Sequence, residues 1–415
     1  MTISAKARLW TSIVRPLHRL LSLPPASPRR VCVSGHPDHE ENSLMAAILL
    51  AEAGSLEVTL LAEDPPDARR YLGVLNRSGA PIEVVDKQSL RGVLRASRAG
   101  MLLVTHGLYG SPDLTARKLV VNMWHGFGPK ATRASTSLRN PVVATVMTCN
   151  SPVWAAAATR ELGSPDTKLI RTGNPRQLAC RTAPDPSLFD RLGLRPRSYV
   201  LWMPTFRSST SVTGRSWRDA PTLSSRSPDG EVPGATETLA GLARDAGVEV
   251  VVKPHPADAD RFERSGLRVL TTDEIFRAGM SLYQFIGASA AMISDYSSVW
   301  VEYLDLDRPL LLYCPDISEY LTGRGLNEPY MTDVARELIT DEPAVVAAFL
   351  ERVRAGGDWR PEARAATRTA LGLDGLELDR AAMTDALLQE LAAFERSRGR
   401  GRERTRGAPT SAVSG

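Results

Sequence analysis

Short apolar runs alternate with amphipathic stretches from residue 31 to residue 183. The runs that predict buried strands lie at 30–35, 58–62, 81–85, 101–105, 119–123, 142–148 and 168–172. Apolar residues at helical spacing fill several of the intervals, as at 42–53 and 68–78. Apolar strands separated by helices are typical of a parallel sheet that is covered on both faces. The pattern predicts one doubly wound, Rossmann-like unit over residues 31–183.

The same pattern begins again near residue 184 and continues to residue 394. Predicted strands lie at 199–203, 248–252, 267–270, 291–294 and 309–313, and predicted helices at 236–246, 299–306, 345–355 and 380–394. A stretch rich in Ser, Thr, Pro, Gly and Arg at 208–234 predicts a long loop. A chain of 415 residues has room for two such units. We therefore expect an α/β protein of GT-B type, with two doubly wound, Rossmann-like domains, residues 31–183 and 184–394, that face each other across a cleft.

Basic residues gather at both ends of the chain, although the formal net charge is only +4. Residues 1–30 combine basic and apolar side chains at helical spacing and contain no acidic residue. Such a segment favours an amphipathic helix on an anionic membrane surface, and the alternative is a helix that docks on the protein itself. The Arg-rich residues 395–415 are predicted to be a disordered tail. No apolar run approaches the ~20 residues that a membrane-spanning helix needs.

The composition is that of a globular protein with large cores, since 43% of the residues are hydrophobic and 24% are charged. The body between the basic ends has no excess of basic residues, so no nucleic-acid partner is expected. The four cysteines are far apart, and none belongs to a Cys-x-x-Cys pair. This usage is typical of buried thiols in a reducing cytosol, without disulfides or a zinc site.

Four short motifs follow predicted strands, at the sheet edge where open α/β folds bind ligands. They are Trp124-His125-Gly126, Met203-Pro204-Thr205-Phe206-Arg207, Lys253-Pro254-His255-Pro256 and Ser294-Asp295-Tyr296-Ser297-Ser298. The last motif opens a helix, where hydroxyl and backbone N–H groups can bind phosphate, although Ser297 or Asp295 could instead cap that helix. The flanking prolines aim His255, and Gly126 lets a ligand approach the backbone beside His125. Either histidine could also be purely structural.

In this order, the four motifs resemble those of the CDP-glycerol glycerophosphotransferases of teichoic-acid synthesis. Further matches are Glu41-Asn42-Ser43, Gly173-Asn174-Pro175-Arg176, the strand at 309–313, Asp316, Tyr320, Arg324-Gly325 and Asp374-Gly375 followed by Arg380. The resemblance covers residues 31–391. The chain departs from the family pattern at Phe127-Gly128-Pro129-Lys130, Leu178, Phe206 and Val301-Glu302-Tyr303. These departures leave the polyol and the acceptor open more than the reaction class.

The resemblance implies a transferase in which an acceptor hydroxyl attacks the β-phosphate of CDP-glycerol, or of a related CDP-polyol, and CMP leaves. The acceptor would be a lipid-linked cell-envelope polymer, so the protein would work as a peripheral protein at the cytoplasmic face of the membrane. The first domain would hold this acceptor and the second the CDP donor. No cofactor and no metal ion are required by this interpretation.

The resemblance also assigns roles to individual residues. His125 would be the general base, because a hydroxyl is a poor nucleophile and a neutral imidazole can accept its proton. The transferring phosphate and the leaving CMP would be stabilised by His255, Ser297, Ser298 and Arg324. Thr205, Arg207 and Lys253 would bind the donor. Glu302 would orient a histidine or bind the ribose.

Three other functions remain open. A GT-B glycosyltransferase would share the fold and the anion site, but it would release a nucleoside diphosphate. A zinc-dependent deacetylase is suggested by Gly35-His36-Pro37-Asp38-His39-Glu40, although no later histidine pair supplies further ligands. A non-enzymatic scaffold would not need the histidines and the serine pair. Asp305-Leu306-Asp307 matches a metal-binding Asp-x-Asp pattern, but it falls in a predicted helix-to-strand turn at the wrong end of the sheet and is interpreted as a solvated turn.

Overall fold

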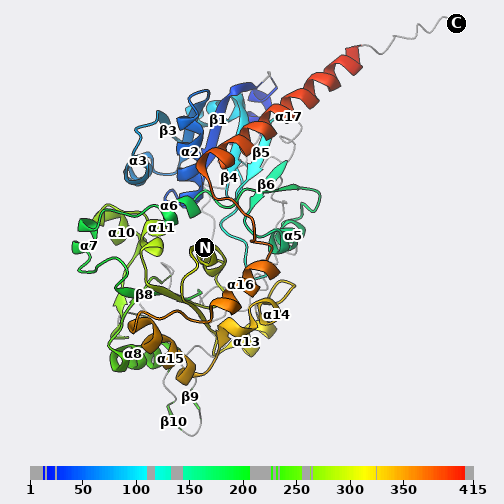
Figure 1. Ribbon diagram of the computed structural model, residues 1–415. Helices are drawn as coiled ribbons and strands as arrows, with labels where there is room; N and C mark the ends of the chain where they lie inside the picture. The colour runs from blue at the N-terminus through cyan, green and yellow to red at the C-terminus, as the bar shows by residue number, and fades with distance from the viewer. Residues whose placement is uncertain are drawn as a thin grey trace, which may run out of the picture.

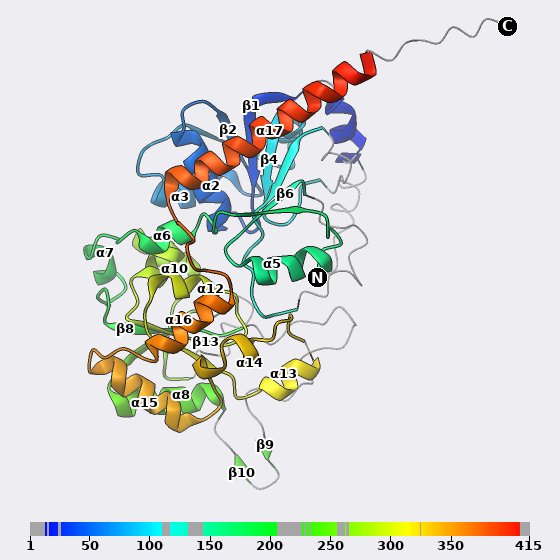
Figure 2. The same ribbon diagram turned by 45° about the vertical axis from the view of Figure 1, so that its right-hand side comes forward.

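The computed structural model (Figure 1) describes residues 13–14, 16–23, 26–109, 117–131, 144–205, 226–227, 230–231, 234–254, 262, 265–323 and 325–406. Over these residues the chain forms two parallel sheets, one in each half, with helices packed on them. Figures 1 and 2 show the two units one above the other, with the first unit at the top. The expectation of two Rossmann-like α/β units is confirmed.

The first sheet has seven strands in the order β3-β2-β1-β4-β5-β6-β7. The strands are β1 (Ser27–Ser34), β2 (Glu57–Ala62), β3 (Ile82–Asp86), β4 (Ala99–Val104), β5 (Leu119–Asn122), β6 (Val146–Cys149) and β7 (Lys168–Arg171), and the helices between them are α2 (Glu41–Glu52), α3 (Pro65–Leu75), α4 (Leu90–Arg98) and α5 (Pro152–Glu161). All neighbouring strands pair in parallel. Val31 and Val33 pack in the cluster that contains α2, whereas Cys32 packs in the cluster that contains Ala96 of α4. Both faces of β1 are therefore buried, which explains its apolar sequence.

The second sheet has six strands in the order β12-β11-β8-β13-β14-β15, and these also pair in parallel. The strands are β8 (Tyr199–Met203), β11 (Glu249–Val252), β12 (Arg268–Val269), β13 (Ala291–Ser294), β14 (Leu310–Tyr313) and β15 (Ile339–Thr340). The helices are α8 (Ala235–Ala246), α10 (Thr272–Ala278), α11 (Leu282–Gly287), α12 (Val299–Tyr303), α13 (Ile317–Gly323), α14 (Met331–Val334), α15 (Pro343–Arg354) and α16 (Pro361–Ala370), with 3₁₀ turns η5 (Leu304–Leu306) and η6 (Arg336–Leu338). A small pair, β9 (Arg226–Ser227) and β10 (Gly230–Glu231), lies within the predicted long loop.

The last helix, α17 (Arg380–Arg406), differs from the sequence-based expectation in two ways. Residues 380–394 were expected to close the second domain, but Met383, Leu387 and Leu391 pack in the core of the first sheet. Ion pairs of Arg380 with Glu52 and of Lys168 with Glu390 fix the helix there. The helix also continues through residue 406, so the first part of the expected disordered tail is helical, since its Arg and Glu residues are good helix formers. Figure 1 shows α17, in red, lying across the first unit.

A shared hydrophobic cluster joins the two units. Two short helices, α6 (Gln177–Arg181) and α7 (Ser187–Asp190), connect them. Trp154 of α5 packs edge-on against Trp300 of α12, with ring centroids 5.7 Å apart, and its indole N–H donates to the carbonyl of Pro329 at 3.0 Å. Phe127, in the loop after β5, is buried in the same cluster. The two sheets are therefore held in a fixed relation by packed side chains rather than by a linker alone.

The N-terminal segment that the structure describes is helical and docks on the first unit. Val14, His18 and Ser22, which are four residues apart, are buried. His18 lies against Tyr109, with ring centroids 5.0 Å apart. The other side of the segment exposes apolar residues to solvent, namely Ile13, Leu20 and Leu23. None of the described helices is long and apolar enough to cross a bilayer.

Candidate functional site

The loop after β5, which carries Trp124-His125-Gly126, lies directly against the start of α12 in the second unit. A Cβ atom at Gly126 would come within 2.5 Å of the Ser298 hydroxyl, and one at Gly128 within 2.7 Å of the Ser298 Cα. Gly126 also has φ = +115°, which side chains strongly disfavour. The first and fourth sequence motifs, far apart along the chain, thus meet in space, and both glycines are required by the close approach.

The same loop is clamped from its other side by residues 325–327. Lys130 and Leu326 form an antiparallel bridge, and the Ala131 N–H donates to the Gly325 carbonyl at 3.2 Å. The Asn327 amide donates to the carbonyls of Gly128 and Lys130, each at 3.2 Å. The loop of the first unit is therefore held at both ends by the second unit.

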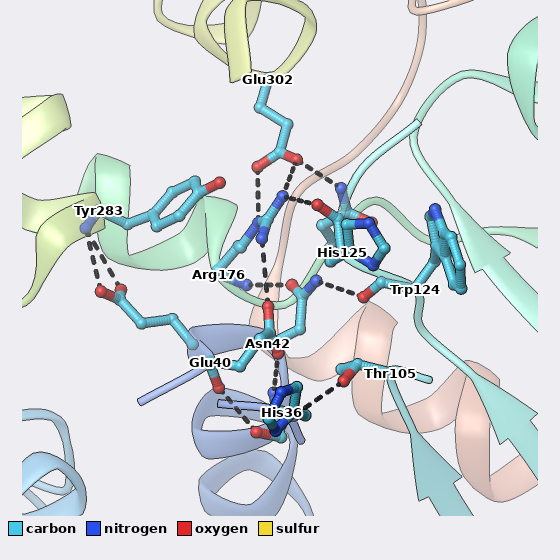
Figure 3. Close-up of polar contacts among 12 residues, drawn as sticks. His36, Glu40, Asn42, Thr105, Trp124, His125, Arg176, Tyr283 and Glu302 are labelled. Atoms are coloured by element: carbon cyan, nitrogen blue, oxygen red, sulfur yellow. Dashed lines mark hydrogen bonds and ion pairs between the residues drawn. The ribbon is translucent and has the colours of Figure 1, made fainter. Parts of the chain in front are cut away.

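Arg176, in the turn after β7, forms the centre of a buried network that positions His125 (Figure 3). Its guanidinium pairs with the Glu302 carboxylate through Nε–Oε2 at 3.0 Å and Nη2–Oε1 at 2.6 Å. The Nη2 group also donates to the His125 carbonyl at 2.9 Å. Glu302 accepts a further hydrogen bond from the Asn174 amide at 2.9 Å. Glu302 thus contacts the His125 main chain through Arg176, and its expected role, to orient a histidine or bind the ribose, stays a prediction.

Residues at the start of α2 complete this network. Arg176 Nη1 pairs with Glu40 at 3.1 Å. Asn42 accepts from the Arg176 N–H and donates to the Trp124 carbonyl, both at 3.2 Å. Burial raises the pKa of Glu40, although Arg176 and two backbone amides favour its charged form. The network therefore ties the ends of three strands in the first unit to α12 in the second.

His125 itself is accessible to solvent, although protein atoms surround it on most sides. Desolvation, together with the nearby His106, Lys130 and Arg176, lowers its pKa well below the usual 6.5. The ring stacks on His106 with centroids 4.7 Å apart and an interplanar angle of 7°. At neutral pH the imidazole is therefore uncharged and able to accept a proton, as a general base requires.

The strand ends of the second unit are held together by Asp295. Its carboxylate accepts from the Thr205 N–H at 2.9 Å, from the Thr205 hydroxyl at 2.5 Å and from the Ser297 N–H at 3.3 Å. The Ser297 hydroxyl accepts from the Val299 N–H at 3.5 Å, which is a weak capping contact, and Ser298 makes no side-chain cap. Thr205 and the serine pair are thus brought together beside His125, with Thr205 bound to Asp295.

Lys253, at the end of β11, lies close to Glu41 of the first unit. Desolvation lowers the pKa of Lys253 to about 8, although Glu41 favours its charged form. Burial likewise raises the pKa of Glu41 to about 7. The hydrogen bonds that Glu41 accepts from Ser281 and from the Tyr283 N–H, at the start of α11, act in the opposite direction and lower this pKa. The hydrogen bond from the Tyr283 N–H to Glu41 is a second polar contact between the units.

Three predicted site residues, Arg207, His255 and Arg324, lie outside the described residues. No role in the transfer reaction was predicted for Arg176, Glu40 or Asn42, although all three belong to motifs named above. His106 was missed altogether. Its only sequence signal is its position directly after the strand β4.

The residues that suggested a metal site have other partners. His36 pairs with Glu63 at 3.3 Å, and Asp38 accepts from the backbone N–H groups of Glu63 and Asp64. The two acids of the Asp-x-Asp pattern form ion pairs with Arg181 and Arg364. Among the described residues, no group of three His, Cys, Asp or Glu side chains is arranged to hold a metal ion.

Comparisons with known proteins agree with this geometry. The model of the CDP-glycerol:poly(glycerophosphate) glycerophosphotransferase family matches residues 58–369. The teichoic acid glycerol-phosphate primase of Bacillus subtilis is 22% identical over 200 residues, which cover 48% of this chain and 47% of that protein. The teichoic acid ribitol-phosphate polymerase TarL of Staphylococcus aureus is 24% identical over 208 residues, 48% of this chain and 33% of that protein. The teichoic acid ribitol-phosphate primase of Bacillus spizizenii is 41% identical, but over only 66 residues, 16% of this chain and 17% of that protein. The chain thus matches less than half the length of each of these relatives.

Solved structures share the fold. A structure of the wall teichoic acid polymerase TagF superposes with a TM-score of 0.64 at 15% identity and covers 94% of this chain and 96% of that chain. A putative UDP-N-acetylglucosamine 2-epimerase from Listeria monocytogenes superposes with a TM-score of 0.50 at 12% identity, over 87% of this chain and 95% of that chain. These likenesses confirm the expected GT-B-like arrangement of the two units.

Proposed function

Because the chain belongs to the CDP-glycerol:poly(glycerophosphate) glycerophosphotransferase family, we propose that it transfers a polyol phosphate from CDP-glycerol, or a related CDP-polyol, to a hydroxyl of a lipid-linked cell-envelope polymer. The observation that carries the proposal is the contact of the His125 loop with Ser298. This contact brings the loop that carries His125 against a serine whose hydroxyl would bind a phosphate. The relatives named as teichoic acid primases and polymerases support the same reaction class.

The reaction follows from the properties of these groups. His125 accepts the proton of the acceptor hydroxyl as its oxygen attacks the β-phosphorus of the donor. A new P–O bond forms to the acceptor, the anhydride bond to the α-phosphate breaks, and CMP leaves with the electron pair. Because Arg176 holds the His125 carbonyl and is itself held by Glu302, the base is fixed before the substrates arrive.

The donor phosphates would be bound from the second unit. Ser297 and Ser298 offer hydroxyls next to the His125 loop, and Lys253 offers a positive charge close to the domain contact. We assign further phosphate contacts to Arg207, His255 and Arg324, which lie outside the described residues. Thr205 holds Asp295 and so supports the loop that carries the serines.

We assign the membrane contact to the N-terminal segment together with α4. His18 lies against the first unit next to Lys118, whose ammonium donates to the carbonyls of Ala96 and Ser97 in α4. Leu90 and Leu94 of α4 are 70% and 44% exposed. Three apolar residues of the N-terminal segment are exposed as well, namely Ile13, Leu20 and Leu23. Apolar side chains with interspersed arginines suit the surface of an anionic bilayer. The protein would then act as a peripheral protein at the cytoplasmic face.

Sedimentation with phosphatidylglycerol vesicles tests this contact. The double variant Leu90→Ser, Leu94→Ser should pellet less than the wild type at low salt. The matched control is Leu321→Ser, which removes an exposed leucine from α13 in the second unit. Equal pelleting of all three proteins would place the membrane contact elsewhere.

A donor screen tests the reaction and separates it from glycosyl transfer. Purified protein, with membranes that carry lipid-linked acceptor, is given CDP-glycerol, CDP-ribitol or a UDP-sugar. The proposal predicts CMP release from a CDP-polyol and no turnover of the UDP-sugar. Release of UDP without CMP would identify a glycosyltransferase instead.

A further inference from the structure

The order of the strands in the first unit reverses between β1 and β4, and we call the space beyond the carboxyl ends of these two strands the crevice. The chain runs from β1 to β2 and β3 on one side and then crosses to β4, β5, β6 and β7 on the other. In open α/β sheets, ligands bind at such a switch point, between the carboxyl ends of the two central strands. Here those strands are β1 and β4, and they are followed by His36 and by Thr105-His106.

Hydrogen bonds hold these residues as a unit. The buried Thr105 hydroxyl accepts from the His36 N–H at 3.3 Å and lies 3.1 Å from Nδ1 of His106. A buried hydroxyl proton needs an acceptor, and His106 Nδ1 is the acceptor that the described contacts provide. The proton of neutral His106 therefore resides on Nε2, since desolvation lowers its pKa to about 4. His106 is fixed as an Nε2–H hydrogen-bond donor.

Three imidazole rings, of which the last is the proposed base His125, lie in a row that begins at this crevice. His36 lies edge-on to His106 with centroids 5.7 Å apart, and His106 stacks on His125 at 4.7 Å. Figure 3 shows His36 and Thr105 on the side of Asn42 that faces away from Glu302. A ligand in the crevice would thus reach the base from the first unit, opposite the serines of the second unit.

The acidic side chains near His36 are already engaged by other groups. Nδ1 of His36 and Nζ of Lys87 both contact one carboxylate, that of Glu63, at 3.3 Å and 2.6 Å. The other nearby acid, Asp38, is bound to two backbone N–H groups. The His36 side chain is 59% exposed, and a Cβ at Gly107, next to His106, would meet no atom within 4 Å. Both carboxylates are thus engaged, and the His36 ring and Gly107 border open space.

We propose that this crevice binds the terminal polyol-phosphate unit of the acceptor, with its phosphate at His36 and at Nε2–H of His106 and its free hydroxyl at His125. The inference rests on the proposed function, because it places the acceptor of that reaction. A polyol-phosphate unit carries a hydroxyl and a phosphate on one short carbon chain, and the row of rings offers a base for the first and donors for the second. His36 and His106 are acceptor-binding residues in this arrangement.

Binding is tested without turnover by NMR. The six histidine Hε1–Cε1 signals, assigned by single substitutions, are followed during titration with sn-glycerol 3-phosphate, with CMP present to fill the nucleotide site. The signals of His36 and His106 should move together, and His36→Ala should weaken binding at least tenfold. His106→Gln, which keeps an amide N–H donor near the Nε2 position, should bind better than His106→Ala. No movement of the His36 and His106 signals would overturn the inference.

The matched control is Arg30→Ala. Arg30 pairs with Glu57 across β1 and β2 at 2.9 Å, as His36 pairs with Glu63 at the other end of the same two strands. Arg30→Ala should bind sn-glycerol 3-phosphate like the wild type, and equal losses in both variants would contradict a local site. Calorimetry with CDP-glycerol separates the two claims, since His36→Ala should leave donor affinity unchanged. If the wild type turns over no CDP-polyol yet the titration succeeds, the polyol-phosphate site stands and the proposed reaction fails.

Discussion

Arg176 and Glu302 form a buried ion pair that joins the two halves of the molecule next to His125, the proposed catalytic base. The two residues are separated by 126 positions in the chain, and their atoms approach to 2.6 Å. Arg176 uses the same Nη2 group to hold the His125 carbonyl. The position of the base in the first unit therefore depends on a carboxylate in the second.

Breaking this pair should be costly. Glu302→Gln leaves the guanidinium buried with less compensation, and loss of one partner of a buried pair costs about 3–5 kcal/mol. The double variant Arg176→Met, Glu302→Leu should lose less than the sum of the two single losses, because neither charge remains unpaired. Urea unfolding of the wild type, Arg176→Met, Glu302→Leu and the double variant measures this coupling. Additive losses would show that the pair is not a unit.

The close approach of the His125 loop to Ser298 predicts a glycine requirement. Gly126→Ala should lower activity by at least tenfold, because its Cβ would lie 2.5 Å from the Ser298 hydroxyl in a backbone conformation that alanine disfavours. Gly241→Ala is the control, since a Cβ there meets no atom within 4 Å in α8. That change should stabilise the protein by up to about 1 kcal/mol and leave activity unchanged. Full activity of Gly126→Ala would mean that the loop moves away during turnover.

The pH dependence of kcat/KM for the donor follows from two groups. His125 acts when neutral, and its lowered pKa keeps it neutral at pH 6.5 and above. Lys253 acts when protonated, and its pKa of about 8 means that this charge is lost above that pH. The profile should be flat from pH 6.5 to 7.5 and fall as the pH passes about 8. Lys253→Arg should move the fall to higher pH, and an unchanged fall would remove Lys253 from donor binding.

Glu41 should make stability depend on pH. Its pKa is about 7 in the folded protein against 4.5 for an ordinary glutamate, so the folded state binds an extra proton between these values. The free energy of unfolding therefore falls as the pH rises from 4.5 to 7, by at most about 1.4 kcal/mol per pH unit for this group. Glu41→Gln cannot titrate and should lose less stability over this range. Parallel urea curves at pH 5 and pH 7 measure the difference, and equal losses would show that Glu41 is charged throughout.

The strands and the family motifs were predictable because each is marked by residues that are close together in the sequence. Apolar runs marked β1, β8 and β13, and the motif order indicated the family. The partners of the motif residues were not predictable, because the pairing of Arg176 with Glu302 depends on how the two sheets pack. The placement of α17 has the same cause, since its apolar residues suit either core and sequence order alone favoured the second.

His106 could not be singled out from the sequence for a different reason. A single histidine after a strand carries no motif, and its significance lies in its stacking on His125 and its bond to Thr105. Both contacts need the carboxyl ends of β4 and β5 side by side, which only the strand order supplies.

One measurement tests the central claim most directly. CDP-glycerol with ¹³C in its glycerol is incubated with membranes that carry lipid-linked acceptor, and both CMP and labelled polymer are quantified for the wild type and for His125→Asn. The wild type should form CMP and labelled polymer in equal amounts. The variant, with an unchanged melting temperature, should be at least about 100-fold slower, because it lacks the general base. Equal rates for the two proteins, or label that never reaches the polymer, would contradict the account.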